Sequence, residues 1–333
     1  DHRSQPLHRR RLDSGVSEMR LITLADIAAA RERIAAHVPL TPIVAMNPSG
    51  LRVKAESLQP IGAFKLRGAF NALLTLSDEQ RAAGVVAHSS GNHAQAVAYA
   101  AARLGVAATI VMPDNAPSPK VEGVRREGAE IVTVGAASAE RAAMARKLAT
   151  ERGCALIEPF DMDVIMAGTG TIGLEILDQA SDVETVFAPV SGGGLLGGLA
   201  TAIKLTRPDV SVIGVEPERA ADAQASFRAG EIVSITAEQA GSTLADGLRV
   251  QRLGERTWPH IRAYVDDIVT VSEEAMRAAM RSIAREARLI AEPSGAVAIA
   301  GALAHGADNR RSVAVLSGGN VEPALYATIL AEG

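Results

Sequence analysis

Cysteine is nearly absent from this chain of 333 residues, in which Cys154 is the single example. A disulfide framework within the chain and a metal cluster held by several thiolates are therefore excluded. Such sparse use of cysteine is typical of a reducing compartment, and we expect a cytoplasmic protein. Aromatic residues make up only 3% of the sequence, so the core must be filled mainly by Val, Leu, Ile and Ala.

The sequence also lacks a strong excess of one charge and a long apolar run. Its formal net charge is -4, without a long block of one sign, so no nucleic-acid partner is expected. No apolar stretch is long and unbroken enough to span a bilayer, so no membrane partner is expected either. The start of the chain is polar, rich in arginine and without the apolar core of a signal peptide. We interpret residues 1–18, which precede Met19, as a flexible leader.

Short apolar, β-branched runs alternate with longer alanine-rich helical patterns along most of the chain. The predicted strands are residues 85–89, 108–112, 130–134, 185–190, 211–216 and 312–316. The predicted helices include residues 92–104, 120–127, 139–152, 195–205, 273–288 and 295–303. This alternation predicts an α/β fold in which parallel sheets are flanked by helices.

A lysine lies between two apolar residues in the segment GAFKLRG, residues 62–68. The amine of Lys65 would be partly desolvated there, which lowers its pKa and makes it a better nucleophile toward an aldehyde. The glycines on either side permit the close approach of a flat ligand. A surface lysine beside a half-buried aromatic residue is the structural alternative, and it is the better explanation of such a lysine in isolation.

The segment HSSGNH, residues 88–93, follows a predicted strand and opens a predicted helix. Free backbone N–H groups at a helix start form an anion site suited to a carboxylate or a phosphate. Ser89, Ser90 and Asn92 add side-chain donors. A plain helix cap needs only one such residue, so the cluster favours a ligand. The two histidines are not spaced to meet on one helix face, and we do not expect a metal here.

A glycine cluster, SGGGLLGG at residues 191–198, also joins a predicted strand to a helix. Glycines allow backbone amides to surround a phosphate. A different class of protein is equally compatible with this segment. Gly192, Gly194 and Gly197 fit the dinucleotide pattern G-x-G-x-x-G, and Glu216 lies about 20 residues further on, where a ribose-binding acid would lie. The short pattern is easily met among so many glycines, so we place it second.

Two further segments have ordinary structural explanations when each is taken alone. Ser317 begins a glycine turn after the last predicted strand and could donate a hydrogen bond to a heterocycle nitrogen, but in isolation a structural turn is the better explanation. Glu216 and Asp222 follow another strand; hard cations prefer such oxygen ligands, but a solvated acidic loop is the simpler interpretation.

In their order and spacing, the segments GAFKLRGA, SSGNH, SGGGL and SGGN resemble the fold-type II pyridoxal-phosphate (PLP) enzymes, the tryptophan synthase β family. The resemblance is greatest to the branch of threonine/serine dehydratases (ammonia-lyases) and serine racemases, and it covers about residues 23–330. It implies a two-domain α/β fold with open, twisted parallel sheets and the cofactor between the domains. The implied domains are a large PLP-binding domain, residues 19–78 and 162–333, and a small mobile domain, residues 84–160. A homodimer is also implied.

The resemblance implies a role for each of these segments. Lys65 would hold PLP as a Schiff base, Phe64 would pack against the pyridine ring and Ser317 would face the pyridine nitrogen. Asn92 would bind the ring hydroxyl. The phosphate would be held by the backbone amides of Gly192, Gly193, Gly194 and Leu195. The substrate carboxylate would be held by Ser89, Ser90, Gly91, Asn92 and His93.

The resemblance also separates members of the branch. Ser90 matches the acid/base residue of serine racemases, where many biosynthetic threonine dehydratases have alanine. Glu216, the carbonyl of Ala220, and Asp222 match the divalent-cation site of serine racemase-like members, which would hold Mg, Mn or Ca. Ala63 departs from the family, because many relatives have serine there. The pair at residues 160–161, Phe-Asp, is more similar to threonine dehydratases than to mammalian-type serine racemases.

We therefore predict a PLP-dependent lyase of the EC 4.3.1 type that converts L-threonine or L-serine to 2-oxobutyrate or pyruvate plus ammonia. Lys65 would remove the Cα proton, and Ser90 would act from the opposite face. Serine racemase and 3-hydroxyaspartate dehydratase are alternatives on the same scaffold. An NAD-dependent oxidoreductase built on the glycine cluster and an amino-acid-binding protein without catalytic activity are alternatives of other classes.

Overall fold

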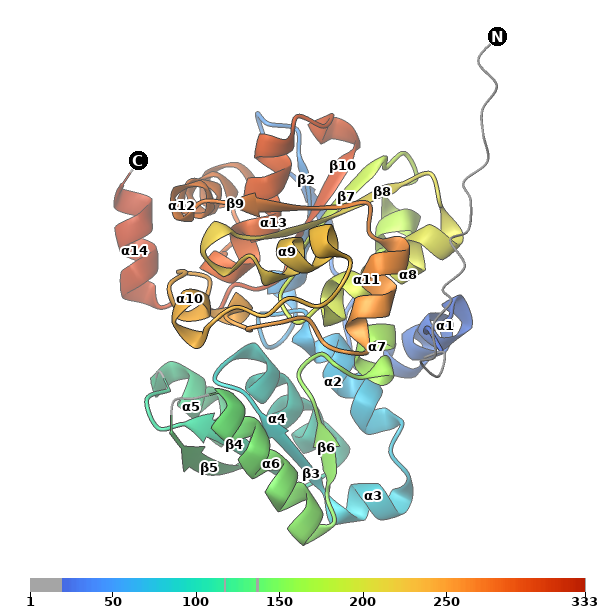
Figure 1. The fold of residues 1–333 in the computed structure, drawn as a ribbon, viewed down its shortest axis with the longest axis vertical. Coiled ribbons are helices and arrows are strands. Elements are labelled where there is room, and N and C mark those ends of the chain that lie inside the picture. Colours follow the sequence, from blue (N-terminus) through green and yellow to red (C-terminus); the bar gives the residue numbers. More distant parts are fainter. Residues whose placement is uncertain (1–19, 117, 136–137, 333) are drawn as a thin grey trace.

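Two separate sheets organise the chain, one of six strands and one of four. The computed structural model describes residues 20–116, 118–135 and 138–332, so the predicted leader, residues 1–18, lies outside the described residues. The six-stranded sheet and its helices form the upper part of Figure 1, and the four-stranded sheet and its helices form the lower part. The predicted α/β class, with parallel sheets flanked by helices, is confirmed.

The six-stranded sheet joins segments from the beginning, middle and end of the chain. It runs in the order β1-β2-β10-β7-β8-β9, and all neighbours are parallel except β1 and β2. Its strands are β1 (Ile43–Ala45), β2 (Arg52–Ala55), β7 (Thr185–Pro189), β8 (Ser211–Pro217), β9 (Asp267–Val271) and β10 (Ser312–Leu316). β10 pairs with both β2 and β7, so it joins the strands from the beginning of the chain to those from its middle.

Both faces of this sheet are buried, which explains why its strands are almost continuously apolar. Side chains alternate between the faces, so Phe187 packs into one core cluster and Val186 into the other. The helices of this part are α1 (Leu24–Ile34), α2 (Lys65–Leu74), α7 (Asp163–Gln179), α8 (Gly194–Thr206), α9 (Asp222–Ala229), α10 (Ala237–Gly241), α11 (Thr257–Tyr264), α12 (Glu273–Ser282), α13 (Pro293–His305) and α14 (Pro323–Ala331). Short helical turns are η1 (Glu56–Leu58), η2 (Glu218–Ala220), η3 (Asp246–Leu248), η4 (Ile283–Ala287) and η5 (Asn309–Arg311).

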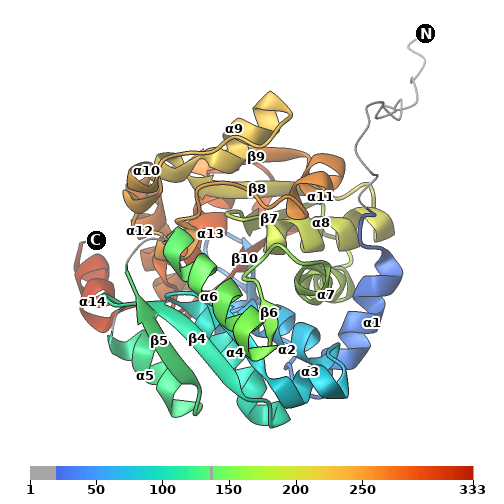
Figure 2. The ribbon, with the colours of Figure 1, turned by 60° about the horizontal axis from the view of Figure 1, so that its bottom comes forward.

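The four-stranded sheet is formed by one continuous stretch of the chain and is parallel throughout, in the order β5-β4-β3-β6. Its elements are α3 (Asp78–Ala83), β3 (Val85–His88), α4 (Asn92–Leu104), β4 (Ala108–Pro113), α5 (Ser118–Arg126), β5 (Glu130–Val134), α6 (Ser138–Arg152) and β6 (Ala155–Ile157). Ala87 packs with Val97 of α4, whereas Val86 packs with Ala145 of α6, so helices cover both faces (Figure 2).

Helices α2 and α7 lie at the junction of the two parts (Figure 1). They cross closely because Gly168 of α7 has no side chain: a Cβ there would lie 2.7 Å from the carbonyl oxygen of Arg67 in α2. Any larger residue at this position would push α7 away from the helix that begins with Lys65. The glycine therefore fixes where Lys65 stands relative to both sheets.

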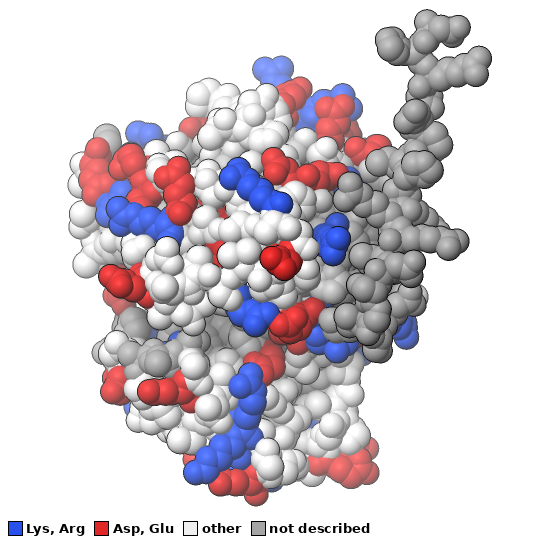
Figure 3. Space-filling view, viewed as in Figure 1, with Lys and Arg blue, Asp and Glu red and all other residues white. Residues whose placement is uncertain are grey.

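Some predicted boundaries were wrong. The helix predicted over residues 273–288 is α-helical only as far as Ser282 and continues as a π-helical turn. The helical stretch ends at Arg288, which adopts a left-handed conformation with φ of 57°. The strand predicted to end at Ser89 ends at His88. Among the described residues, we find no helix that combines the length and the apolar character needed to cross a bilayer. Lysine and arginine side chains are interspersed with acidic ones on the face shown in Figure 3.

Candidate active site

The side chain of Lys65 reaches from the first residue of α2 to the segment between β6 and α7. Its Nζ donates a hydrogen bond to the carbonyl oxygen of Pro159 at 2.7 Å and lies 5.1 Å from the centre of the Phe64 ring. The side chain is half-buried, and desolvation lowers the pKa of its amine from 10.5 to about 8. A larger share of this amine is therefore neutral and nucleophilic near neutral pH than in an exposed lysine.

The lysine segment and the last glycine turn lie side by side. The backbone N–H of Phe64 donates to the carbonyl oxygen of Ser317 at 3.0 Å, and that of Gly319 donates to Gly62 at 2.9 Å. Ser317 is buried, and its hydroxyl is 3.5 Å from the carbonyl oxygen of Ser294. Two segments that are about 250 residues apart in sequence are thus joined by main-chain hydrogen bonds. They follow β2 and β10, which are paired as neighbouring parallel strands.

The segment of residues 88–93 lies between β3 and α4, as predicted. The hydroxyl of Ser89 accepts a hydrogen bond from the N–H of Gly91 at 3.1 Å. Ser90 is half-buried, and its hydroxyl has no hydrogen-bond partner among the described residues. His93 is buried with its Nε2 2.9 Å from the carbonyl oxygen of Ile157, and burial lowers its pKa to about 3, so the ring is neutral. A hydroxyl and the helix start are therefore left for a ligand.

Asn92 links this segment to the other sheet. Its Nδ2 donates to Oε1 of Glu292 at 2.6 Å, and its Oδ1 accepts from Asn320 at 2.8 Å. Glu292 is buried at the start of α13, and burial together with the charge of Asp246 raises its pKa to about 8. Glu292 was not among the predicted site residues, although an acidic residue directly before Pro293, near a predicted helix start, was the available signal.

A second contact between the two parts is an ion pair. Lys120 of α5 pairs with Asp246 of η3. The hydroxyl of Ser294 lies 3.4 Å from the same aspartate and accepts a hydrogen bond from the N–H of Gly247 at 2.8 Å. A Cβ at Gly91 would lie 3.6 Å from Nζ of Lys120, so this pair lies beside the residue 88–93 segment.

The glycine cluster forms the turn between β7 and α8. The carbonyl oxygen of Gly192 accepts from Oγ1 of Thr257 at 2.6 Å and from the N–H of Gly254 at 3.1 Å. A Cβ at Gly192 would lie 2.5 Å from the ring of Phe160, so the missing side chain lets that ring pack on the turn. The hydroxyl of Ser191 is buried without a hydrogen-bond partner in the described part of the chain. A buried hydroxyl normally has a hydrogen-bond partner, and this one lies just before the N-terminus of α8, where a phosphate could supply the acceptor.

Asp161 holds this turn in place indirectly, through the chain at residues 255–257. Its carboxylate accepts hydrogen bonds from three successive backbone N–H groups, those of Glu255 at 3.1 Å, Arg256 at 2.8 Å and Thr257 at 3.2 Å. Since Thr257 in turn donates to Gly192, Asp161 positions the glycine turn through one intervening residue. A negative charge at the start of α11 is also favoured by the helix dipole.

Glu216 and Asp222, on either side of the turn after β8, are buried rather than solvated. Glu216 accepts from the N–H groups of Ala223 at 3.2 Å and Gln224 at 2.6 Å, while both oxygens of Asp222 are buried without a partner among the described residues. Burial raises the pKa of Glu216 to about 8 and that of Asp222 to about 7. Two carboxylates beside the backbone of Ala220 match the donors that a hard cation prefers. No larger cluster of metal-binding side chains occurs in the described residues.

These residues fit PLP in three respects that the structure itself supplies. The amine of Lys65 has a lowered pKa, the hydroxyl of Ser191 lacks a partner among the described residues at the start of α8, and the buried Ser317 is joined to Phe64 by a main-chain hydrogen bond. An aldehyde, a phosphate and a heterocycle nitrogen would each have a matching group.

The chain is similar to known proteins over most of its length. The family described as pyridoxal-phosphate dependent enzyme matches residues 15–318. The L-threo-3-hydroxyaspartate ammonia-lyase of Saccharomyces cerevisiae is 42% identical over 316 residues, which cover 92% of this chain and 96% of that protein. The serine racemase of Arabidopsis thaliana is 40% identical over 312 residues, which cover 90% of this chain and 93% of that protein. The crystal structure of the T.th. threonine deaminase superposes with a TM-score of 0.85 at 46% identity and covers 90% of this chain and 99% of its own.

Proposed function

Because the chain belongs to the family of pyridoxal-phosphate dependent enzymes, we propose that it is an ammonia-lyase that converts L-threonine or L-serine to 2-oxobutyrate or pyruvate plus ammonia. The observation that carries this proposal is the amine of Lys65, held at Pro159 with a pKa of about 8, in a segment whose Phe64 is hydrogen bonded to the main chain of the buried Ser317. When bound, PLP supplies the electron sink for charge that develops at the substrate Cα.

Lys65 is the proposed base. Its amine, neutral in a shielded site, accepts the Cα proton of the substrate. Ser317 would offer a neutral hydroxyl to the pyridine nitrogen of bound PLP; such a donor would not enforce protonation of that nitrogen, and a weaker electron sink would favour prompt loss of the β-hydroxyl. Phe64 packs against the cofactor ring, and its main chain is fixed by the hydrogen bond to Ser317.

The remaining contacts divide between the two parts of the molecule. Backbone N–H groups of residues 192–195, at the start of α8, hold the cofactor phosphate, because these groups have no partner within the helix. The residue 88–93 segment holds the substrate carboxylate with its hydroxyls and the start of α4. Asn92 already binds Glu292 and Asn320, so its proposed contact with the ring hydroxyl requires that it share or exchange these partners.

We propose the division into a large domain, residues 19–78 and 162–333, and a small mobile domain, residues 84–160. Two contacts that cross between them support a closing movement: Asn92 with Glu292, and Lys120 with Asp246. Closure would bring the carboxylate-binding segment onto the substrate and exclude water. A homodimer in the cytoplasm is also proposed; the single cysteine suits that compartment.

Racemisation of serine is a second candidate, supported by the hydroxyl of Ser90, which has no protein partner among the described residues and could return a proton to Cα. Action on 3-hydroxyaspartate is a third, supported by the 42% identity to the yeast ammonia-lyase. A cation at Glu216, the carbonyl of Ala220, and Asp222 is proposed with each. Dinucleotide binding is disfavoured by the family and by Glu216, whose oxygens already accept from two backbone N–H groups.

The test is release of 2-oxo acid by the PLP-loaded protein from L-threonine, L-serine and L-threo-3-hydroxyaspartate, with chiral analysis of recovered serine. We expect Lys65→Ala to abolish release and the visible band of bound PLP. Lys204→Ala, which removes an amine paired with Asp266 outside the site, should retain both. Oxo-acid release by Lys65→Ala would refute the proposal. D-serine without oxo acid, lost in Ser90→Ala, would establish the racemase instead.

A further inference from the structure

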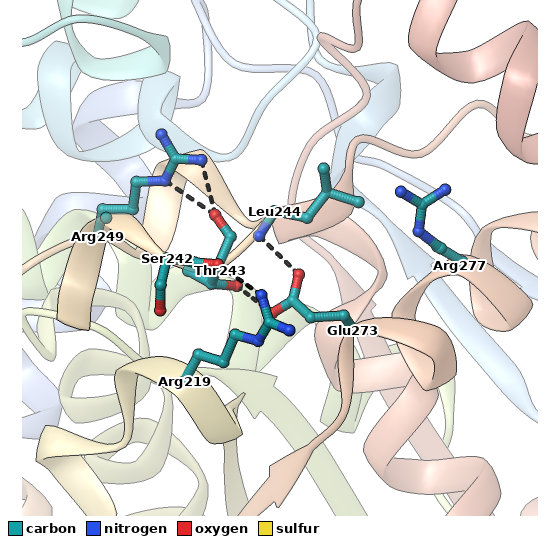
Figure 4. Close-up of a pocket in the computed structure, with 8 residues that line it drawn as sticks. Arg219, Ser242, Thr243, Leu244, Arg249, Glu273 and Arg277 are labelled. Atoms are coloured by element: carbon teal, nitrogen blue, oxygen red, sulfur yellow. Dashed lines mark hydrogen bonds between the residues drawn. The ribbon is translucent and has the colours of Figure 1, made fainter. Parts of the chain in front are cut away.

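A cavity between η2, the end of α10 and α12 gathers positive charge (Figure 4). Its volume is about 370 Å³, and its lining includes Arg219, Ser242, Thr243, Arg249, Glu273 and Arg277. The three arginines come from separate segments: η2, the chain that follows η3, and α12. None of them belongs to the residues assigned above to the cofactor, the substrate or the cation.

The single carboxylate of this cavity is already engaged. Glu273 accepts a hydrogen bond from Oγ1 of Thr243 at 2.7 Å and one from the N–H of Leu244 at 2.7 Å (Figure 4). It forms no ion pair with the arginines of the cavity among the described residues. The lining thus carries three guanidinium groups and one carboxylate, and of the three arginines Arg277 alone pairs with a carboxylate outside the lining, that of Glu332, within the described part of the chain.

Two of the guanidinium groups are held in place by neutral partners. Nη1 of Arg219 donates to the carbonyl oxygen of Ser242 at 3.1 Å, and Nε and Nη2 of Arg249 donate to that of Thr243 at 3.0 and 2.6 Å. Carbonyl oxygens orient an arginine without neutralising it. Arg277 is paired with Glu332 at 2.8 Å, but the same carboxylate also binds Arg281 at 3.4 Å. Each arginine of the cavity keeps N–H groups that no described residue occupies.

We infer that this cavity binds a small metabolite that carries a phosphate group. Fixed guanidinium groups match phosphate oxygens with paired, charge-assisted hydrogen bonds. The volume is within the range of about 300 to 1,000 Å³ that is typical of small-molecule sites, so it accommodates more than a bare ion. The volume leaves room for an organic group beside the phosphate, and glycerol 3-phosphate is a probe of that chemistry.

The wall of the cavity connects it to the active site. Ser242, Thr243 and Leu244 run directly into η3, where Asp246 pairs with Lys120 across the junction of the two sheets. Arg219 and Arg249 donate to the carbonyl oxygens of Ser242 and Thr243, so a ligand that binds both arginines would restrict the movement of this part of the main chain. The anion site is therefore placed to change the position of Asp246 without touching the substrate, and we expect it to regulate the enzyme.

The experiment is isothermal titration calorimetry of the PLP-loaded protein at constant ionic strength, in which the cofactor phosphate already fills its own site. The probes are glycerol 3-phosphate, inorganic phosphate and succinate. We expect glycerol 3-phosphate to bind saturably at one site per chain and more tightly than the other two. Arg249→Gln and Arg277→Gln should each weaken it about tenfold or more, since each removes a charge-assisted contact.

Two matched pairs of variants isolate the cavity. Arg207→Gln removes one positive charge and one donor to a main-chain carbonyl elsewhere, at Ser181, and should leave binding unchanged. Gly241→Asp adds a negative charge to the lining at a position where a Cβ meets nothing within 4 Å, so it should abolish binding without removing an arginine, while Gly241→Ser should not.

Three outcomes would overturn the inference. The first is no saturable binding of glycerol 3-phosphate by the unaltered protein. The second is binding that Arg277→Gln and Gly241→Asp leave unchanged although both variants retain the PLP band, which would mean an adventitious ion only. The third is tighter binding of succinate than of glycerol 3-phosphate, which would assign the cavity to a dicarboxylate.

Discussion

The amine of Lys65 donates a hydrogen bond to the carbonyl oxygen of Pro159 at 2.7 Å, across 94 positions of sequence. Lys65 begins α2, whereas Pro159 lies in the segment through which the chain returns from the four-stranded sheet to the six-stranded one. The reactive amine is thus held at the junction of the two parts of the molecule. A movement of one part relative to the other would change its partner and its exposure to water.

The lowered pKa of Lys65 leads to a pH-dependence for cofactor uptake. We expect the rate at which the apoprotein takes up PLP to rise with pH and to level off above about 8, because the neutral amine is the nucleophile and burial lowers its pKa to about 8. Visible absorbance would follow the uptake from about pH 6 to about pH 10. Lys204→Ala should show the same profile. A midpoint near the ordinary lysine pKa of 10.5 would mean that the amine is not desolvated.

Asp161 should control how tightly PLP is held, although it does not face the cofactor. Asp161→Asn weakens the three hydrogen bonds from residues 255–257 and so loosens Thr257, which holds Gly192. We expect the dissociation constant of PLP to rise about tenfold, in keeping with the loss of roughly 1.5 kcal/mol from charge-assisted hydrogen bonds. The measurement is equilibrium titration of the apoprotein with PLP.

Asp163→Asn is the matched control for that experiment. Asp163 lies two positions away and pairs with Arg256 at 2.5 Å, but both side chains are exposed, and such pairs contribute little. We expect its PLP affinity to be unchanged. Equal affinities in both variants would show that the glycine turn does not depend on Asp161.

Much of this site could be predicted because its parts are local. The glycine turn and the residue 88–93 segment each join a strand to a helix, and short-range patterns determine such junctions. The lysine segment follows η1 and opens α2, a helix that was not among the predicted ones. Asp161 and Glu292 act on backbone about 95 and 25 positions away, at Arg256 and Gly318, and no local pattern specifies such pairings. Phe160 shows the same limit: the glycine at 192 admits its ring and the glycine at 194 admits its main chain, a packing reason that the phosphate interpretation did not contain.

The boundaries that failed have physical reasons too. Residues 283–287 retain a helical periodicity and good helix formers, so the sequence favoured a continuous helix. The chain instead widens into a π-turn and ends at Arg288, and this brings it back toward Glu292 and the active site. Tertiary packing decides such an ending, because an arginine carries no intrinsic preference for a positive φ.

A divalent cation should stabilise the protein through Glu216 and Asp222, more strongly at higher pH. The raised pKa values, about 8 and about 7, mean that the folded protein binds more protons than the unfolded chain above about pH 4. Without a cation, this part of the stability is present at low pH and is lost as pH rises through about 7 to 8. A cation replaces those protons, so its stabilising effect should grow over the same interval.

Thermal unfolding with Mg²⁺, Mn²⁺ or Ca²⁺ at about pH 6 and about pH 8 measures this effect. A cation at 100 times its dissociation constant would contribute about 2.7 kcal/mol. Asp222→Asn should remove the response, and Glu218→Gln, which alters an exposed acid of the same loop, should retain it. An equal response of all three proteins, or one that is larger at the lower pH, would place the cation elsewhere.

Arg67 should be the most sensitive charged residue for the stability of the fold. It lies two positions after Lys65 in α2, fully buried, and binds Glu56 through Nε at 2.8 Å and Glu175 through Nη1 at 2.7 Å. Glu175 also accepts from Lys54 at 2.5 Å. Although burial raises the pKa of Glu56, the paired Arg67 holds it below its usual value, so the Glu56 carboxylate stays a charged partner of the arginine. The network ties α2 to η1 and α7.

We expect Arg67→Ala to lower the free energy of unfolding by about 3–5 kcal/mol, because two carboxylates would remain buried with Lys54 as their single cation. Urea unfolding measures the change. Arg31→Ala, which breaks the exposed pair with Asp178, should cost about 1 kcal/mol or less. Arg67→Met, similar in length but uncharged, should destabilise almost as much as Arg67→Ala if the charge matters, and much less if Arg67 serves mainly to fill space. If the charge of Arg67 matters, its ion network also holds the part of α2 that keeps Lys65 partly buried. Both Arg67 variants should then shift the pH profile of PLP uptake toward 10.5, the ordinary pKa of lysine.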